Sequence, residues 1–218
     1  MICGFDEAGR GPLAGPVCAA AVILPPDFPV ELLGDSKKLS PKKREDARRL
    51  ILKKAPAWGI GWASAAEIDD INILRSSLLA MERAWEDLVL QFPRFFVPPV
   101  PGASSVTTPS VQVLPLQVSP SQVSPLQAVV DGLYTPQLPI PVRALVKADA
   151  SIPAVMAASI LAKTQRDRLM ELYACLYPAY GYETHKGYPT KAHREAVLRH
   201  GPSPIQRLSF EVKATGPG

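Results

Sequence analysis

At 218 residues the chain is long enough for one domain with a buried core, and its formal net charge of +4 favours a polyanionic partner only weakly. Its three cysteines show neither CxxC spacing nor an even count, which argues against a disulfide framework or a zinc site and indicates a reducing compartment. No segment resembles a signal peptide, and the apolar run "PLAGPVCAAAVIL" is too short to cross a bilayer, so we expect a cytoplasmic protein with no membrane partner.

Two short apolar segments near the N-terminus predict strands. "ICGF" is the first, and "VCAAAVIL", which is apolar at every position, is typical of a strand buried on both faces. Between them, "FDEAGRGPLAGP" places Asp6 and Glu7 at the end of the first strand. Neighbours on a regular strand point to opposite faces, so both carboxylates reach one site only where the strand ends. Gly9 and Gly11 allow such an irregular ending and the close approach of another molecule's backbone.

Helical spacing follows in two segments. "LSPKKREDARRLILKKA" predicts a helix that begins at the N-cap Ser40, with the basic run of residues 42–44 on a solvated face. "SAAEIDDINILRSSLLAMERAWEDLVLQF" opens with a capping box of Ser64 and Glu67 and predicts one long core helix. At helical spacing, the stripe expected to be buried contains Ile68, Ile71, Leu74, Leu78, Trp85 and Leu88.

A low-complexity segment comes next. No charged residue occurs from Phe95 to Val130, and the pentads "VLPLQ", "VSPSQ" and "VSPLQ" follow one another over residues 113–127. Proline at every fifth residue prevents a helix and interrupts sheet pairing, which predicts an extended surface insertion over residues 95–126. We interpret it as an inert insertion rather than a partner-binding element, so deleting residues 98–126 is expected to cost little activity.

The remaining segments predict two strands and two helices. "LQAVVDG" predicts a strand that ends on Asp131, and "VRALVKADA" predicts one that ends near Asp149. "PAVMAASILAKTQRDRLMELYACLY" predicts a helix with Pro153 in its first turn and an apolar face made by Met156, Ile160, Leu169, Leu172 and Leu176. The last helix, "TKAHREAVLRH", is expected to start at the N-cap Thr190 and to stop at Gly201.

Three of the predicted strands thus end in acid, at Asp6 with Glu7, at Asp131 and at Asp149. A single such aspartate is most often a turn residue or a helix cap. Four carboxylates that converge at one edge of a sheet repel one another unless a cation neutralises them. Oxygen ligands without histidine or cysteine indicate Mg²⁺ or Mn²⁺ rather than zinc. Arg10 is then interpreted as a donor to a sugar or phosphate oxygen, and the alternative is a salt bridge to one of the neighbouring carboxylates.

Six stretches together resemble bacterial ribonuclease HII. In chain order they are "GFDEAGRGPLAGPVCAAAVIL", "DSKKLS", "EIDDINIL", "VVDG", "KADASIPAVMAASILAKTQRD" and "YGYETHKGYPTKAH", and they span nearly the whole chain except the insertion. The resemblance implies an α/β, RNase H-like fold with a mixed central β-sheet flanked by helices. It also implies a catalytic domain over residues 1–180 and a C-terminal helical extension over residues 181–218 that contributes to substrate binding.

The activity that the resemblance implies is that of a metal-dependent endoribonuclease. Such an enzyme cleaves the RNA strand of RNA/DNA hybrids and nicks 5′ of a ribonucleotide embedded in duplex DNA, leaving a 3′-hydroxyl and a 5′-phosphate. Two Mg²⁺ or Mn²⁺ ions would activate the attacking water and stabilise the departing oxygen. By matching position, four carboxylates would hold these ions: Asp6, Glu7, Asp131 and Asp149. Asp6 is expected to bridge the two ions. By the same resemblance the protein is expected to be a monomer.

Substrate-binding residues carry over in the same way. Gly9, Arg10 and Gly11 match a loop that senses the ribose 2′-hydroxyl, the group that distinguishes RNA from DNA. Tyr188 matches a tyrosine that stacks near the sugar following the ribonucleotide. Arg207 falls where the family also has arginine, and no role is assigned to it.

Lysines in the matched motifs are candidates for phosphate contacts, namely Lys37, Lys38, Lys163 and Lys186. For Lys163 the alternative is an ion pair with Asp167 one helical turn away. His185 and His193 are interpreted as structural or phosphate-contacting groups rather than catalytic ones.

A second hypothesis is a catalytically impaired module that binds RNA/DNA hybrids, with the insertion recruiting a partner. The insertion lies where the strand that leads to Asp131 is expected to begin. If residues 127–130 fail to complete that strand, Asp131 is misplaced and activity falls. Retention of all four carboxylates argues against this hypothesis, because a decayed site usually carries a neutral replacement.

Overall fold

A mixed sheet organises the chain, and the computed structural model describes residues 1–34, 36, 39–93 and 126–212. The strand order is β3-β2-β1-β4-β5, with β1 antiparallel to β2, β2 antiparallel to β3, and β1, β4 and β5 parallel. The strands are β1 (Ile2–Ala8), β2 (Val17–Ile23), β3 (Ala57–Ala63), β4 (Gln127–Asp131) and β5 (Val142–Leu145). The predicted mixed sheet is confirmed, and the pentad repeat falls almost entirely outside the described residues.

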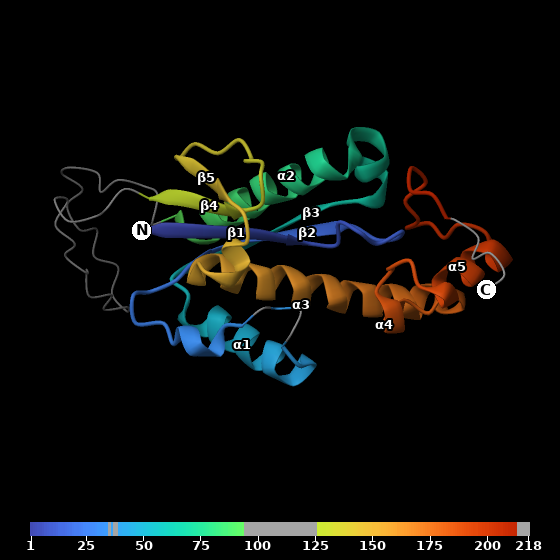
Figure 1. The fold of residues 1–218 in the computed structure, drawn as a ribbon, viewed down its shortest axis with the longest axis horizontal. Helices are drawn as coiled ribbons and strands as arrows, with labels where there is room; N and C mark the ends of the chain where they lie inside the picture. The colour runs from blue at the N-terminus through green and yellow to red at the C-terminus, as the bar shows by residue number, and fades with distance from the viewer. Residues whose placement is uncertain (35, 37–38, 94–125, 213–218) are drawn as a thin grey trace, which may run out of the picture.

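Helices cover both faces of the sheet. Figure 1 shows α2 (Ala65–Gln91) on one face and α3 (Pro153–Leu176) on the other, with α1 (Pro41–Lys54) packed on the outer side of α3. Every residue of β2 is buried, because alternate side chains enter the two different cores. The expectation that "VCAAAVIL" is buried on both faces is therefore confirmed.

The predicted helix starts are present as hydrogen-bonded caps. Ser40 accepts a hydrogen bond from the amide of Lys43 at 3.3 Å. Ser64 accepts from the amide of Glu67 at 3.2 Å, while the Glu67 carboxylate accepts from the Ser64 amide at 2.7 Å, which completes the capping box. Thr190 caps α5 (Lys191–His200), which ends at Gly201.

The expectation of one continuous helix over residues 65–91 is wrong at Asn72. This residue has φ 65° and ψ 165°, so α2 consists of two helical segments joined by a break. The Asn72 side chain accepts from the amides of Leu74 at 3.0 Å and Arg75 at 3.2 Å and so caps the second segment. Of the predicted stripe, Ile68, Trp85 and Leu88 are buried, whereas Ile71, Leu74 and Leu78, which lie beside or soon after the break, are only partly buried. Met81 and several small residues complete the buried face of the second segment.

Two further expectations about helix faces are wrong. Leu172 and Leu176, placed on the apolar face of α3, are 63% and 66% exposed. Here α3 has passed beyond the sheet, and it contacts the C-terminal segment through Met170 and Ala174 instead. In α1, Arg44 is not on a solvated face, because its guanidinium donates to the carbonyls of Ser36 at 2.6 Å and Leu39 at 2.8 Å.

Short helical turns make up much of the C-terminal part. After α3 come η4 (Pro178–Tyr180), α4 (Tyr182–His185) and then α5, at the far end of the sheet from the N-terminus in Figure 1. Two other short turns are η1 (Val30–Leu32) and η3 (Ala148–Ala150). Within the described part of the chain, no helix combines the length and the apolar character needed to cross a membrane.

Candidate active site

Parallel pairing of β1 and β4 brings three carboxylates together. The two strands pair from Ile2 with Gln127 to Phe5 with Val130, so Asp6 and Asp131 are the next residues on neighbouring strands. The negative charge of Asp131 raises the pKa of both Asp6 and Glu7, which places the three groups within electrostatic reach of one another. The strand that leads to Asp131 is thus complete, although it begins directly after the predicted insertion.

Asp6 is the most strongly perturbed of these carboxylates. It is 6% exposed, and burial raises its pKa well above the ordinary value, with the charge of Glu7 raising it further. Two hydrogen bonds oppose this shift: the Glu7 amide donates to the carboxylate at 2.8 Å, and the hydroxyl of Ser159 on α3 is a second donor. A buried carboxylate beside two others is unfavourable as a bare anion, because like charges at close range repel one another.

Glu7 points to the same site but has a cationic partner. Burial raises its pKa, and the guanidinium of Arg10, 3.2 Å from the carboxylate, opposes that rise. The alternative interpretation of Arg10, a salt bridge to its acidic neighbour, therefore describes its contact in this structure. Because the Arg10 side chain is 49% exposed, it remains accessible to another anionic group.

Asp131 and Asp149 are joined through one short turn. The Asp131 carboxylate accepts from the Ala148 amide at 2.7 Å, which fixes the start of η3 against the end of β4. Asp149 lies inside η3 rather than at a strand end, because β5 already stops at Leu145. The expectation that three strands end in acid holds for β1 and β4, whereas a turn positions the fourth carboxylate.

The donor set suits a hard divalent cation. Among the described residues, no group of three His, Cys, Asp or Glu side chains is close enough together to form a ready-made metal site. Three of the carboxylates instead hold local partners: the Glu7 amide, Arg10 and the Ala148 amide. The oxygen-only donors, the burial of Asp6 and the mutual repulsion of the three neighbouring charges all fit Mg²⁺ or Mn²⁺.

The glycines of the loop that follows β1 serve different purposes. A Cβ at Gly9, which has φ +100°, would lie 2.1 Å from Nε of Arg166. Gly9 is therefore required for packing within the protein, and its predicted contact with another molecule stays a prediction. At Gly11 a Cβ would meet, among the described residues, only Tyr188, at 3.7 Å, so this position is open. Within the described residues, the amides of Arg10 and Gly11 donate to no protein acceptor.

Tyr188 lies beside the open glycine. Its side chain is exposed, as predicted for a substrate contact, and the Arg166 guanidinium lies 6.0 Å from its ring centroid.

The two candidate histidines lie behind Tyr188, whose carbonyl accepts a hydrogen bond from Nδ1 of His193 at 3.0 Å. His193 is buried and stacks on His185 with 4.5 Å between ring centroids, while Nε2 of His185 bonds the Tyr180 carbonyl at 2.8 Å. Both histidines are thus held by backbone contacts inside the fold.

The four candidate lysines are placed as follows. Lys37 and Lys38 lie outside the described residues. Lys163 pairs with Asp167 at 2.6 Å, the alternative that its spacing indicated. Lys186 has φ 51° and donates to the Glu171 carboxylate at 2.8 Å and to the Glu183 carbonyl at 2.7 Å. Both described lysines are therefore bound within the protein.

Sequence reasoning missed three buried polar residues around the site. Ser159 and Arg166 on α3 were not singled out at all, and Arg207 was named without a role. The first two interrupt the apolar face of "AASILAKTQRD", and a serine and an arginine on a buried helix face are the signal that was available. Ser159 also bonds the hydroxyl of Ser36 at 2.8 Å, which connects "DSKKLS" to Asp6.

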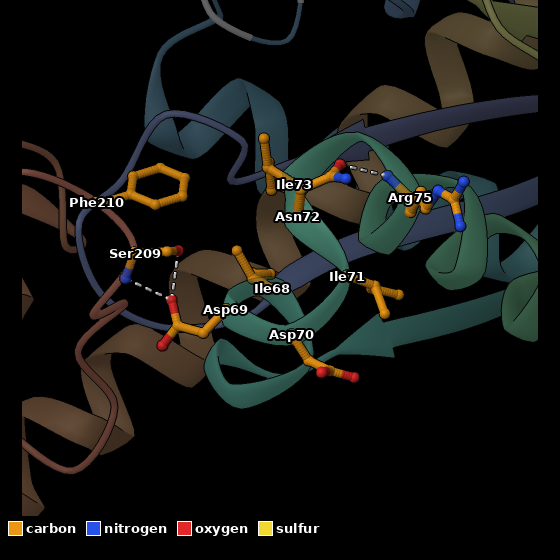
Figure 2. A pocket seen from close by; sticks show the side chains of 9 residues that line it. All are labelled: Ile68, Asp69, Asp70, Ile71, Asn72, Ile73, Arg75, Ser209 and Phe210. Atoms are coloured by element: carbon orange, nitrogen blue, oxygen red, sulfur yellow. Dashed lines mark hydrogen bonds between the residues drawn. The ribbon is translucent and has the colours of Figure 1, made fainter.

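Figure 2 shows a pocket elsewhere on the molecule, at the break in α2. Residues 68–73 and Arg75 line it together with Ser209 and Phe210, and none of the four carboxylates does. Asp69 at its edge accepts from the amides of Leu208 at 2.8 Å and Ser209 at 2.9 Å, and from the Ser209 hydroxyl. The pocket is therefore a junction between α2 and the C-terminal segment.

Comparison with known proteins gives one consistent result. A family model described as ribonuclease HII matches residues 3–213. The ribonuclease HII of Treponema denticola is 50% identical over 223 aligned residues, which cover 98% of this chain and 99% of that protein. The crystal structure of ribonuclease H2 from Pyrococcus horikoshii OT3 matches with a TM-score of 0.66 and 23% identity, covering 97% of this chain and 94% of that one.

A Mn²⁺ complex of Bst-RNase HIII has the same fold. It matches with a TM-score of 0.65 and 16% identity, covering 97% of this chain and 67% of that one. The expected RNase H-like fold is thus confirmed.

Proposed function

This chain belongs to the ribonuclease HII family, and from that premise we propose that Asp6, Glu7, Asp131 and Asp149 are its catalytic, metal-holding residues. The chain is a ribonuclease H endonuclease, as its relatives over nearly its full length are named. The finer activity that we propose is cleavage of the RNA strand of RNA/DNA hybrids and nicking 5′ of a single ribonucleotide in duplex DNA. Its products are a 3′-hydroxyl and a 5′-phosphate.

The observation that carries the proposal is the electrostatic coupling of Asp6 with Glu7 and Asp131. Ribonucleases H depend on divalent metals, and we propose Mg²⁺ or Mn²⁺ as the cofactor. When bound, such cations activate water and stabilise negative charge at a phosphate that is being cut. Asp6 supplies a fixed, buried carboxylate, because the Glu7 amide and the Ser159 hydroxyl hold it in place. Asp131 and η3 carry the last two carboxylates as one unit.

Recognition of the ribonucleotide is proposed for the loop that follows β1. The open space at Gly11 and the amides of Arg10 and Gly11, which donate to no acceptor among the described residues, suit the close approach of a sugar and its 2′-hydroxyl. Exposed Tyr188 on the far side of Gly11 offers an aromatic face to the next sugar. Arg10, now paired with Glu7, is proposed to donate to a sugar or phosphate oxygen.

Backbone phosphates are proposed to be bound by the lysines of the matched motifs, Lys37, Lys38, Lys163 and Lys186. For Lys163 and Lys186 a phosphate would replace Asp167 or Glu171 as the partner. We assign residues 1–180 to the catalytic domain and residues 181–218, which include Lys186 and Tyr188, to a substrate-binding extension. Because one chain supplies every proposed site residue, we propose that the enzyme acts as a monomer.

The second hypothesis, an impaired hybrid-binding module, is not supported. All four carboxylates are present, β4 delivers Asp131 to the end of the sheet, and the relatives carry the name of an active enzyme.

One experiment tests the proposed activity. A labelled DNA duplex with a single ribonucleotide is incubated with the full chain in Mg²⁺, in Mn²⁺ or in EDTA, beside Asp6→Asn and the exposed-residue control Asp27→Asn. We expect the wild type and the control to nick 5′ of the ribonucleotide with at least one metal. EDTA and Asp6→Asn should lower the rate by about a hundredfold or more. The proposal is wrong if nicking persists in EDTA, or if neither metal supports it.

A further inference from the structure

Two fully buried guanidinium groups lie beneath the loop that follows β1. Arg166, on α3, is 1% exposed, and Arg207, in the segment after α5, is 0% exposed. One comes from α3 and the other from the segment after α5, and together they make six hydrogen bonds to backbone carbonyls.

Five of those six carbonyls belong to residues 9–16. Arg207 donates to the carbonyls of Gly9 at 2.6 Å, Arg10 at 3.0 Å and Gly15 at 2.9 Å. Arg166 donates to the carbonyls of Ala14 at 3.1 Å and Pro16 at 3.0 Å. Its remaining bond, to the carbonyl of Lys186 at 2.9 Å, links the loop to the segment that presents Tyr188. Every side-chain nitrogen of both guanidinium groups thus donates a hydrogen bond to a backbone carbonyl.

The charges of these two residues are balanced by no direct ion pair in the described part of the chain. Among the described residues, neither guanidinium lies within 4.0 Å of a carboxylate oxygen. Burial lowers the pKa of both groups, and the charge of Arg166 lowers that of Arg207 further. A buried charge is costly unless its hydrogen bonds are satisfied, so the carbonyls of the loop are held firmly in their present direction.

The direction of the carbonyls decides what the loop offers to a ligand. Arg207 holds the carbonyls of Gly9 and Arg10 toward the protein interior, and the amides of Arg10 and Gly11 make no bond to the described protein residues. The absence of a side chain at Gly9 lets the Arg166 side chain pass directly against the backbone. The two arginines therefore determine the orientation of the amides that lie beside the open position at Gly11.

We propose that Arg166 and Arg207 are positioning residues for discrimination between ribose and deoxyribose: they fix the Gly9–Gly11 backbone so that its amides meet the ribonucleotide. This inference rests on the proposed function of that loop. Lysine cannot replace either residue, because a single ammonium lacks the fork that engages three carbonyls at once.

A second layer of contacts supports Arg207. The ring of Phe210 lies under its guanidinium, 5.2 Å from the centroid to Cζ. Asp69 on α2 accepts hydrogen bonds from the amides of Leu208 and Ser209, the two residues directly after Arg207, as Figure 2 shows for Ser209. Removing the Asp69 contacts therefore loosens the segment that carries Arg207 without touching the loop or the carboxylates.

Competition kinetics test the proposal in the full chain. With Mg²⁺ present, KM and kcat are measured on a labelled duplex with one ribonucleotide, and Ki is measured for the same sequence as unlabelled all-DNA duplex. The variants are Arg207→Lys, Arg166→Lys and Asp69→Asn. The control is Arg83→Lys, which alters an arginine that donates to the Trp62 carbonyl and to Glu67 and, among the described residues, to no carbonyl of residues 9–16.

For Arg207→Lys and Arg166→Lys we expect the ratio of Ki to KM to fall by about tenfold, mainly because KM rises while Ki stays constant. Asp69→Asn should lower the ratio by less, and Arg83→Lys should leave it unchanged.

A purely structural role would lower kcat through loss of folded enzyme and leave the ratio of Ki to KM as it is, and that result overturns the proposal. If thermal melts show that either lysine variant does not fold, an unchanged ratio in Asp69→Asn overturns it. A wild-type enzyme that cleaves but has equal Ki and KM refutes the proposed role of the loop itself.

Discussion

The guanidinium of Arg207 donates a 2.6 Å hydrogen bond to the carbonyl of Gly9, a residue 198 positions earlier in the chain. Gly9 directly follows the strand that carries two of the four carboxylates, so this bond connects the C-terminal segment to the catalytic end of the sheet. The loop between these carboxylates and Tyr188 is therefore held from beneath by tertiary contacts. Several properties of the enzyme should depend on it.

Gly9→Ala should destabilise the fold. Its φ of +100° is strained for any side chain, and the new methyl group would overlap Nε and Cδ of Arg166, at 2.1 and 2.4 Å. We expect a loss of about 2–3 kcal/mol in the free energy of unfolding, measured by urea denaturation monitored by circular dichroism. An unfolding curve equal to that of the wild type would show that Arg166 does not occupy this position.

Gly11→Ala should have the opposite profile. Only Tyr188 lies within reach of an added methyl group, at 3.7 Å, so the free energy of unfolding should change by less than about 0.5 kcal/mol. Because the methyl group fills the space proposed for the sugar, KM for a duplex with one ribonucleotide should rise about tenfold or more. Steady-state kinetics on the two glycine variants, each corrected for the folded fraction, separate the two roles. An unchanged KM in Gly11→Ala would exclude close approach of the sugar at this residue.

Ser159→Ala should lower activity although the serine is neither a metal ligand nor a substrate contact. Its hydroxyl donates to the Asp6 carboxylate and is bonded in turn to Ser36 at 2.8 Å. A hydrogen bond to a charged group contributes about 1.5 kcal/mol or more, which corresponds to roughly a tenfold loss in kcat/KM. The matched control is Ser77→Ala, a buried serine on α2 that donates to the Ile73 carbonyl at 2.8 Å on the other face of the sheet. Equal activity of the two variants would contradict the assigned contact.

Glu67→Gln should reduce stability in a pH-dependent way. Hydrogen bonds from Arg83, and then from the Ser64 amide, lower the pKa of Glu67 from 4.5 to about 2. A carboxylate whose pKa is lower in the folded state stabilises the fold fully above pH 4.5, and this stabilisation is lost as the pH falls toward 2. The wild type should therefore exceed the variant in stability at neutral pH, by at most about 1 kcal/mol because the pair is solvent-screened.

Urea denaturation at pH 7, 5 and 3 measures this difference in the free energy of unfolding. It should be largest at neutral pH and should shrink at pH 3. Glu31→Gln, an exposed residue with no cap or ion pair among the described contacts, is the control and should show no such trend. A difference that grows on acidification would contradict the assignment.

Shortening the low-complexity segment should leave the enzyme active. Leu126 packs against the core, so the deletion tested is residues 98–125, one residue shorter than the sequence suggested. The four carboxylates, the loop after β1 and all of β4 come from other residues, so kcat/KM should stay within about twofold of the wild type. A large loss of activity with an intact melting transition would assign the segment a role in the substrate complex.

Local patterns in the sequence were sufficient for much of this molecule. An uninterrupted apolar run identified β2, and the short apolar run before Asp131 identified β4. Hydrogen-bonding side chains identified the caps Ser40, Ser64 and Thr190, because capping depends on neighbouring residues. The motif order identified the family, and the acidic residues at three predicted strand ends led to the prediction of a metal site.

The tertiary structure decided what depends on residues far apart in the chain. Periodicity gave no sign of the break at Asn72, because one backbone angle outside the helical range interrupts the helix while Ile68 before it and Trp85 and Leu88 after it stay buried as predicted. The exposure of Leu172 and Leu176 depends on where α3 passes beyond the sheet. The role of Gly9 could not be inferred from its own segment. The Arg166 side chain occupies the space where a Cβ of residue 9 would lie, and the Arg207 guanidinium donates to the Gly9 carbonyl. A local motif specifies which groups are present, whereas long-range packing specifies which way they face.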